Sequence, residues 1–191
     1  MFDLNEFAKE IHQNAVAHGW WEGERSADEI IALIHSEWSE ALEEYRAGRP
    51  LVWHKCPYNS GKCETQEVHQ GDFGCRSCTP DKRKPEGIAV ELIDGCIRIL
   101  DFLVQQDCEF PANIDLEEFR DEAIDKFTHL VCFVHGMTAQ FLLEDDVNFL
   151  FGAFCMALLW VKDQGLDPLA LMQEKHENNK SRPYKHGGKV C

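Results

Sequence analysis

The sequence predicts an all-α protein, a bundle of five or six helices. Apolar residues recur at helical spacing along most of the 191 residues, and capping residues stand where helices should begin. Strand signals are few, and hydrophobic residues make up 44% of the chain, which is enough to build a core. We therefore expect a single domain over residues 1–191, interrupted by two inserts.

The first two helices are marked by their caps. Asp3 with Glu6, and Ser26 with Glu29, have the capping-box spacing, in which a side-chain oxygen caps the third following amide and the acid reaches back. From Ser26 an apolar stripe predicts a helix to about Arg46.

Two later helices are more apolar than a surface helix needs to be. Residues 88–105 are apolar over more than half of the helix circumference, which predicts a central position in the bundle. Residues 146–162 have a similar composition. Because these faces exceed what a small bundle can cover, we expect a homodimer or a higher homo-oligomer.

The remaining helices complete the predicted bundle. Asp115 is placed to cap a helix that carries apolar residues to Phe141, within a helical insert at about 117–165. Asp167, followed by a first-turn proline, opens a last helix to about Asn179.

Charge and composition exclude several partners. The formal net charge of −15 argues against a nucleic-acid binder, which needs a basic face to meet phosphates. The N-terminus lacks a basic segment followed by an apolar run, and the longest apolar stretch, 149–161, is too short to span a bilayer. We expect a cytoplasmic protein that binds no membrane.

Two pairs of acids carry the first functional signal. Glu37 and Glu40 lie three residues apart on one predicted helix, and Glu91 and Asp94 have the same spacing on another. Two such helices can bring four carboxylates to one point, where hard oxygen ligands suit Mg²⁺ or Mn²⁺. The alternative is a solvated acidic face, but Asp94 lies among apolar residues, where an unpaired carboxylate is costly.

Residues 51–84 form a cysteine-rich insert without helical period. Cys56, Cys63, Cys75 and Cys78 can supply four thiolates for a structural, tetrahedral zinc site, and Cys75-x-x-Cys78 is the usual half of such a site. The alternative is a set of reduced surface thiols on a loop.

The C-terminal segment is basic in an otherwise acidic chain. Lys175, Asn179, Arg182 and Lys185 precede two glycines, and basic side chains with accessible backbone amides suit a polyphosphate. The alternative is a disordered basic tail.

These segments resemble a known family. LIHSEWSEALEEYRAGR followed by GIAVELIDGCIRILD is similar to the MazG-like, all-α nucleoside triphosphate pyrophosphatase superfamily, which carries Glu-x-x-Glu on one helix and Glu-x-x-Asp on the next. The segment HGWWEGERSADEI and the ending K-x-x-x-N-K-S-R-P-Y-K-H-G-G-K resemble a bacterial and phage branch of it. The resemblance covers roughly half of the chain.

The resemblance implies a Mg²⁺-dependent hydrolase that cleaves a (deoxy)nucleoside triphosphate to the monophosphate and pyrophosphate, a nucleotide-pool housecleaning activity. The implied Mg²⁺ ligands are Glu37, Glu40, Glu91 and Asp94, and the implied phosphate contacts are Lys175, Asn179 and Arg182. Either carboxylate of the first motif can orient the attacking water, and we favour Glu40 over Glu37. Trp20 and Trp21 can stack on the base, or can instead pack the first helix against the bundle.

Three alternatives remain at this point. A related all-α dUTPase or dCTP-hydrolysing enzyme differs only in its choice of base. A non-catalytic metal- and nucleotide-binding sensor, or a partner-binding module, keeps the metal cluster without the reaction. A di-iron bundle is disfavoured, because the helices that carry the acids lack its Glu-x-x-His pairs.

Overall fold

The computed structural model describes residues 3–23, 25–55, 67–69 and 83–185, with the backbone alone for 67–69. The described chain is mostly helical, as the sequence predicts. Its α-helices are α1 (Leu4–Ala17), α2 (Ala27–Arg46), α3 (Ile88–Gln105), α4 (Phe127–Glu144), α5 (Asn148–Asp163) and α6 (Pro168–Lys180).

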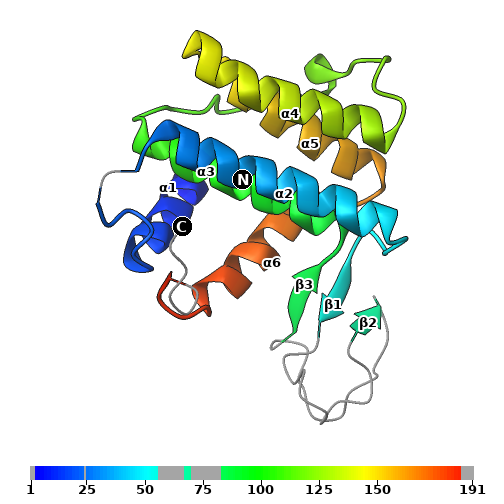
Figure 1. Cartoon of the computed structure of the whole chain (residues 1–191), viewed down its shortest axis with the longest axis horizontal. Helices are drawn as coiled ribbons and strands as arrows, with labels where there is room; N and C mark the ends of the chain where they lie inside the picture. The colour runs from blue at the N-terminus through cyan, green and yellow to red at the C-terminus, as the bar shows by residue number, and fades with distance from the viewer. Residues whose placement is uncertain (1–2, 24, 56–66, 70–82, 186–191) are drawn as a thin grey trace.

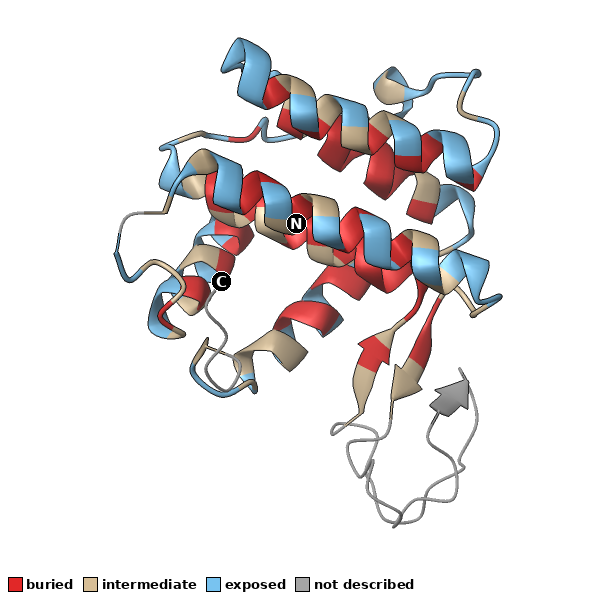
Figure 2. Cartoon of the chain, in the orientation of Figure 1, coloured by how far each residue is buried: buried red, intermediate tan, exposed pale blue. Residues whose placement is uncertain are grey.

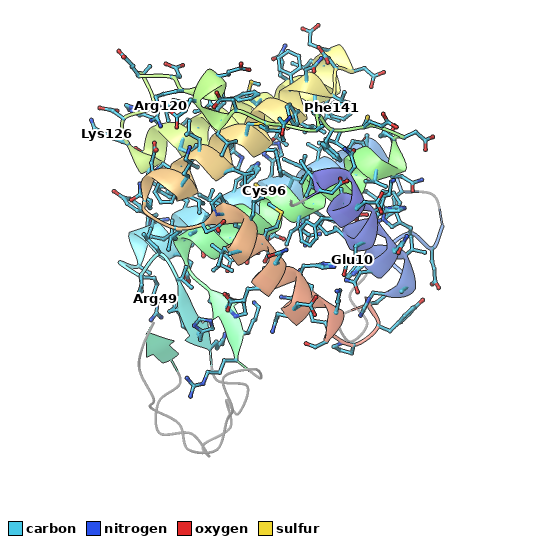
Figure 3. All side chains as sticks on the ribbon, turned by 180° about the vertical axis from the view of Figure 1, so that it is seen from behind. Glu10, Arg49, Cys96, Arg120, Lys126 and Phe141 are labelled. Carbon is cyan, nitrogen blue, oxygen red and sulfur yellow. The ribbon has the colours of Figure 1, made fainter. Side chains whose placement is uncertain are left out.

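The helices are arranged around α3, which is the most buried of them (Figures 1 and 2). Helix α2 lies along α3, the pair α4 and α5 covers one side of them, and α1 and α6 contact α3 from the other side. Cys96, in the middle of α3, is fully buried near the centre of the molecule (Figure 3). One continuous hydrophobic core therefore includes both helices of the insert.

The predicted caps form, with one difference. Ser26 and Glu29 make the complete capping box at the start of α2. Asp3 accepts hydrogen bonds from the amides of Asn5 and Glu6, whereas the Glu6 carboxylate pairs with Lys9, 2.9 Å away. The Glu6 carboxylate, which would complete a capping box, thus forms a surface ion pair with Lys9 instead.

Helices α2 and α3 approach each other closely at Gly95. The Trp38 indole is completely buried, and its N–H donates to the Thr138 hydroxyl, 3.0 Å away on α4. A Cβ atom on Gly95 would overlap the six-membered ring of this indole. Trp38 therefore joins three helices, and only a residue without a side chain fits beneath it.

We expect Gly95→Ala to lower the free energy of unfolding by about 1–3 kcal/mol, because an overpacked core must shift a buried ring. Gly136→Ala is the matched control: it also lies inside a helix, but nothing is within 4 Å of its Cβ position. We expect the control to gain roughly 0.5–1 kcal/mol from helix propensity. Urea unfolding of both variants measures the difference, and equal effects would contradict this packing.

The prediction of one helix from Asp115 to Phe141 is wrong. Leu116–Phe119 is a 3₁₀ turn capped by Asp115, and α4 begins only at Phe127. Between them Arg120 pairs with Asp163 of α5, 2.8 Å away, and Asp121 accepts the Ala123 amide. Five of the seven residues from 120 to 126 are charged, so a helix there would have little apolar surface to bury. Arg120 and Lys126 mark this connection in Figure 3.

A small antiparallel sheet, with strand order β2-β1-β3, is absent from the sequence prediction. Its strands are β1 (Trp53–Lys55), β2 (Glu67–His69) and β3 (Lys84–Glu86). Each has three residues, which is too short to give a period of two. The Trp53 indole N–H donates to Glu44 of α2, 2.8 Å away, so β1 is tied to the bundle.

The apolar faces of α3 and α5, which predicted a homo-oligomer, are covered by other helices of the same chain. Large exposed apolar side chains remain at the end of α4, where Leu142 and Leu143 are 46% and 77% exposed. Among the described residues no single helix is long and apolar enough to cross a membrane, although α5 and α6 pass that test as a pair bent by 109°.

Candidate metal centre

Three of the four predicted acids meet at one point. Glu37 and Glu40 lie one helical turn apart on α2, and Glu91 lies in the first turn of α3. One carboxylate oxygen of each lies within 4.8 Å of the other two. The side-by-side, antiparallel packing of two helices that each carry i, i+3 acids produces this cluster, and its oxygen donors suit a hard divalent cation.

Burial makes it costly for the carboxyl groups of this cluster to ionise. Glu37 is 6% exposed and Glu91 is 3% exposed, whereas Glu40 is exposed. Burial, together with the Asp94 charge and a hydrogen bond that the Glu91 carboxyl donates to Glu86 of β3, raises the pKa of Glu91 to about 9. Burial also raises the pKa of Glu37. Carboxylates held this close need cationic charge to ionise together, which fits a Mg²⁺ or Mn²⁺ site.

Arg98 supplies part of that charge. Its Nε donates to Glu37 Oε1 across 2.6 Å, which fixes the carboxylate of a predicted ligand. The guanidinium is about one third exposed and lines the pocket described below. Arg98 shares the polar stripe of α3 with Glu91 and Asp94, so the sequence predicts its position on the helix face. The sequence does not predict that it pairs with Glu37.

Asp94, the fourth predicted acid, faces the same pocket but pairs with Lys175. The Lys175 Nζ lies 2.7 Å from Asp94 Oδ2 and donates to the Pro85 carbonyl across 3.3 Å. Burial alone would raise the pKa of Asp94, but the ammonium outweighs it and holds that pKa below its usual value. Lys175 is completely buried. The direct phosphate contact expected of it is therefore replaced by a contact with an acid.

A pocket of about 250 Å³ opens beside the acids, between α1, α2, α3 and α6. All four predicted ligands line it, and so do Trp20, Asn179 and Arg182. The Arg25 guanidinium lies over the Trp20 ring, 5.6 Å from its centroid. An aromatic surface thus shares one pocket with the carboxylates and with four cationic side chains, those of Arg25, Lys84, Arg98 and Arg182.

Besides Lys175, two further predicted substrate contacts, Trp21 and Lys185, lie outside the pocket lining. The Trp21 indole N–H donates to Asp101, 2.9 Å away, and the same carboxylate oxygen accepts from His12 across 2.7 Å. Trp21 therefore packs the loop after α1 against α3, which agrees with the alternative that this residue packs against the bundle. Lys185 forms an ion pair with Glu22, with 3.4 Å between Lys185 Nζ and Glu22 Oε2.

The sequence predicts no role for several residues of the lining, among them Arg25, Lys84, Asp101, Arg98 and His176. Asp101 and Arg98 follow the acids along the polar stripe of α3, so a helical projection can find them. Arg25 and Lys84 are brought in by a loop and by a strand end, for which the sequence has no periodic signal.

The proposed zinc ligands Cys56, Cys63, Cys75 and Cys78 lie outside the described residues. No family model, curated protein or solved structure matches this chain. The functional assignment therefore depends on the residues themselves and on the pocket that they form.

Proposed function

We propose that the protein is a Mg²⁺- or Mn²⁺-dependent nucleoside triphosphate pyrophosphohydrolase of the MazG-like type, which cleaves (deoxy)nucleoside triphosphates to the monophosphate and pyrophosphate. One observation carries the proposal: the acids of both motifs line a single pocket with an aromatic ring and with the tail residues Asn179 and Arg182. The two motifs and the tail are far apart in sequence, so their convergence is not a consequence of local composition.

The positions of the four acids suggest their roles in metal binding and in orienting the attacking water. Glu37, Glu40, Glu91 and Asp94 would hold the cation, which when bound neutralises phosphate charge and lowers the pKa of a water. Glu37 is fixed by Arg98, whereas Glu40 is exposed at the pocket and suits the role of orienting the attacking water.

The opposite ends of the substrate need different surfaces. Arg182 and Arg98 are charged donors in the pocket lining, suited to binding phosphate oxygens and to neutralising the pyrophosphate leaving group. Trp20 offers a flat ring on which a base can stack. Lys175 acts from behind the pocket by setting the charge of Asp94.

A panel of canonical and damaged nucleoside triphosphates, incubated with the protein and Mg²⁺, tests the function directly. We expect pyrophosphate and monophosphate as the products, and no release when the metal is chelated. Nucleotide binding without any pyrophosphate release would overturn the proposal in favour of the sensor. Release of single inorganic phosphate would place the cleaved bond elsewhere.

The cysteine-rich insert makes a separate prediction. We expect one zinc per chain, held by Cys56, Cys63, Cys75 and Cys78, because a polar loop needs a cross-link to become ordered. Elemental analysis of the purified protein measures the zinc, and chelation should free four thiols while the helical circular dichroism persists. Zinc-free protein with these four thiols freely titrating in the native state would contradict the prediction.

A homodimer or higher homo-oligomer also stays a prediction. The exposed end of α4, with Leu142 and Leu143, is now the apolar surface that favours it. Light scattering at micromolar concentration measures the mass, and we expect at least twice that of the 22.0 kDa chain. A monomer mass would contradict it.

A further inference from the structure

Asp101 of α3 lines the pocket and is held by only one of its two carboxylate oxygens. Its Oδ1 accepts from the Trp21 indole N–H, 2.9 Å away, and lies 2.7 Å from His12 Nδ1 on α1. Within the described part of the chain, Asp101 Oδ2 has no hydrogen-bond partner, and the side chain is 18% exposed. Both oxygens of a carboxylate are acceptors, so Oδ2 is free to accept a hydrogen bond from a ligand in the pocket.

This acid lies at the end of the pocket away from the metal centre. It follows Asp94 by seven residues on α3, which is two helical turns or roughly 10 Å. The Trp20 ring and the apolar side chain of Ile11 line the same pocket. Each of them is the chain neighbour of a residue that contacts Asp101 Oδ1. An aromatic surface, an apolar contact and one directed acceptor together form a surface suited to a nucleobase.

A free carboxylate oxygen discriminates between bases because it only accepts. Adenine, cytosine and guanine carry exocyclic amino groups, which donate hydrogen bonds. Thymine and uracil carry carbonyl oxygens instead, and their one ring N–H lies between the two carbonyl groups. A carbonyl group turned towards the carboxylate would bring two acceptors together and leave both without a hydrogen bond, which lowers the affinity for that base.

We propose that Asp101 is a specificity-determining residue, which selects nucleoside triphosphates whose base carries an exocyclic amino group. Trp21 and His12 fix Oδ1, and Oδ2 accepts a hydrogen bond from the amino group of a base that lies on the Trp20 ring. The identity of the substrate as a triphosphate rests on the proposed function. Of the two related enzymes considered above, this selection favours the dCTP-hydrolysing type over the dUTPase.

Equilibrium binding of α,β-imido triphosphates, which resist cleavage at the proposed bond, tests the base choice without turnover. In the presence of Mg²⁺, each amino-bearing base is compared with a counterpart that lacks the amino group: cytosine with uracil, guanine with hypoxanthine, and adenine with purine. In one or more of these pairs we expect the amino-bearing base to bind about tenfold more tightly, as the loss of a hydrogen bond to a charged group predicts. Equal affinities within all three pairs would overturn the proposal.

Asp101→Asn separates base selection from support of the loop. Its amide can place an N–H donor where Oδ2 stood while its oxygen still accepts from Trp21, so the preference within the selected pair should fall about tenfold. Trp21→Phe removes the same support but keeps the carboxylate, and Asp125→Asn, at an exposed aspartate 2.8 Å from His129, is the matched control for charge. Both should keep the wild-type preference. If Asp101→Asn kept it too, or if Trp21→Phe lost it equally, Asp101 would not select the base.

Pyrophosphate release from the cleavable triphosphates separates this proposal from the proposed function. Selective binding of amino-bearing bases without pyrophosphate release would support the role of Asp101 and count against the pyrophosphohydrolase. Release at equal efficiency from every base would support the enzyme and overturn the role of Asp101. Failure to bind any triphosphate would overturn both.

Discussion

Glu40→Gln should lower pyrophosphate release at least about a hundredfold, a loss of roughly 2.7 kcal/mol in transition-state stabilisation. The change preserves the size of the side chain but removes one negative charge from the cluster that Glu40 forms with Glu37 and Glu91. Because Glu40 is exposed, folding should be retained. Steady-state rates of pyrophosphate release with saturating Mg²⁺ measure the effect.

Glu43→Gln is the control for this change. Glu43 is also an exposed glutamate of α2, but it does not line the pocket. A solvated acidic face predicts the same rate for both variants, since each loses one surface charge. Equal rates for wild type, Glu40→Gln and Glu43→Gln would end the catalytic interpretation of the cluster.

Lys175→Met should produce the largest loss of stability, roughly 3–5 kcal/mol, because it leaves a mostly buried Asp94 carboxylate without its cation. The ammonium is fully buried and 2.7 Å from that carboxylate. The double variant Lys175→Met/Asp94→Asn removes both charges and should recover much of the loss. Urea unfolding in the absence of divalent metal gives all three free energies.

The matched surface change is Lys162→Met. Lys162 pairs with Glu117 across 3.1 Å, but both side chains are about half exposed, so water screens the pair and little change is expected. If Lys175→Met cost no more than Lys162→Met, or if the double variant were less stable than the single one, the Asp94–Lys175 pair would not stabilise the fold as proposed.

Local signals account for what the sequence predicted well. The start of α2 follows from Ser26 and Glu29, and the meeting of Glu37, Glu40 and Glu91 follows from the i, i+3 spacing on two apolar helices. These predictions need only the geometry of a single helix and the assumption that two helices are neighbours.

The remaining features depend on the path of the chain in space. Lys175 has the sequence context of a phosphate ligand, yet α6 turns it inward to Asp94 and the Pro85 carbonyl. Trp20 and Trp21 are adjacent in sequence and have different roles, because the loop directs one to the pocket and the other to Asp101. No periodicity distinguishes such neighbours.

The direct pairing of β1 with β3 has a consequence for how this chain can be shortened. Lys55 is paired with Lys84 in the β1–β3 ladder, so the chain leaves the sheet before the 28 residues 56–83 and re-enters it after them at adjacent points. A tight turn joining these two strands would complete an ordinary β-hairpin. Pro85 and Glu86, which reach Lys175 and Glu91, lie on the bundle side of that junction. The cysteine-rich segment thus begins and ends at the tip of the β1–β3 pair, whose other end contacts the candidate metal centre.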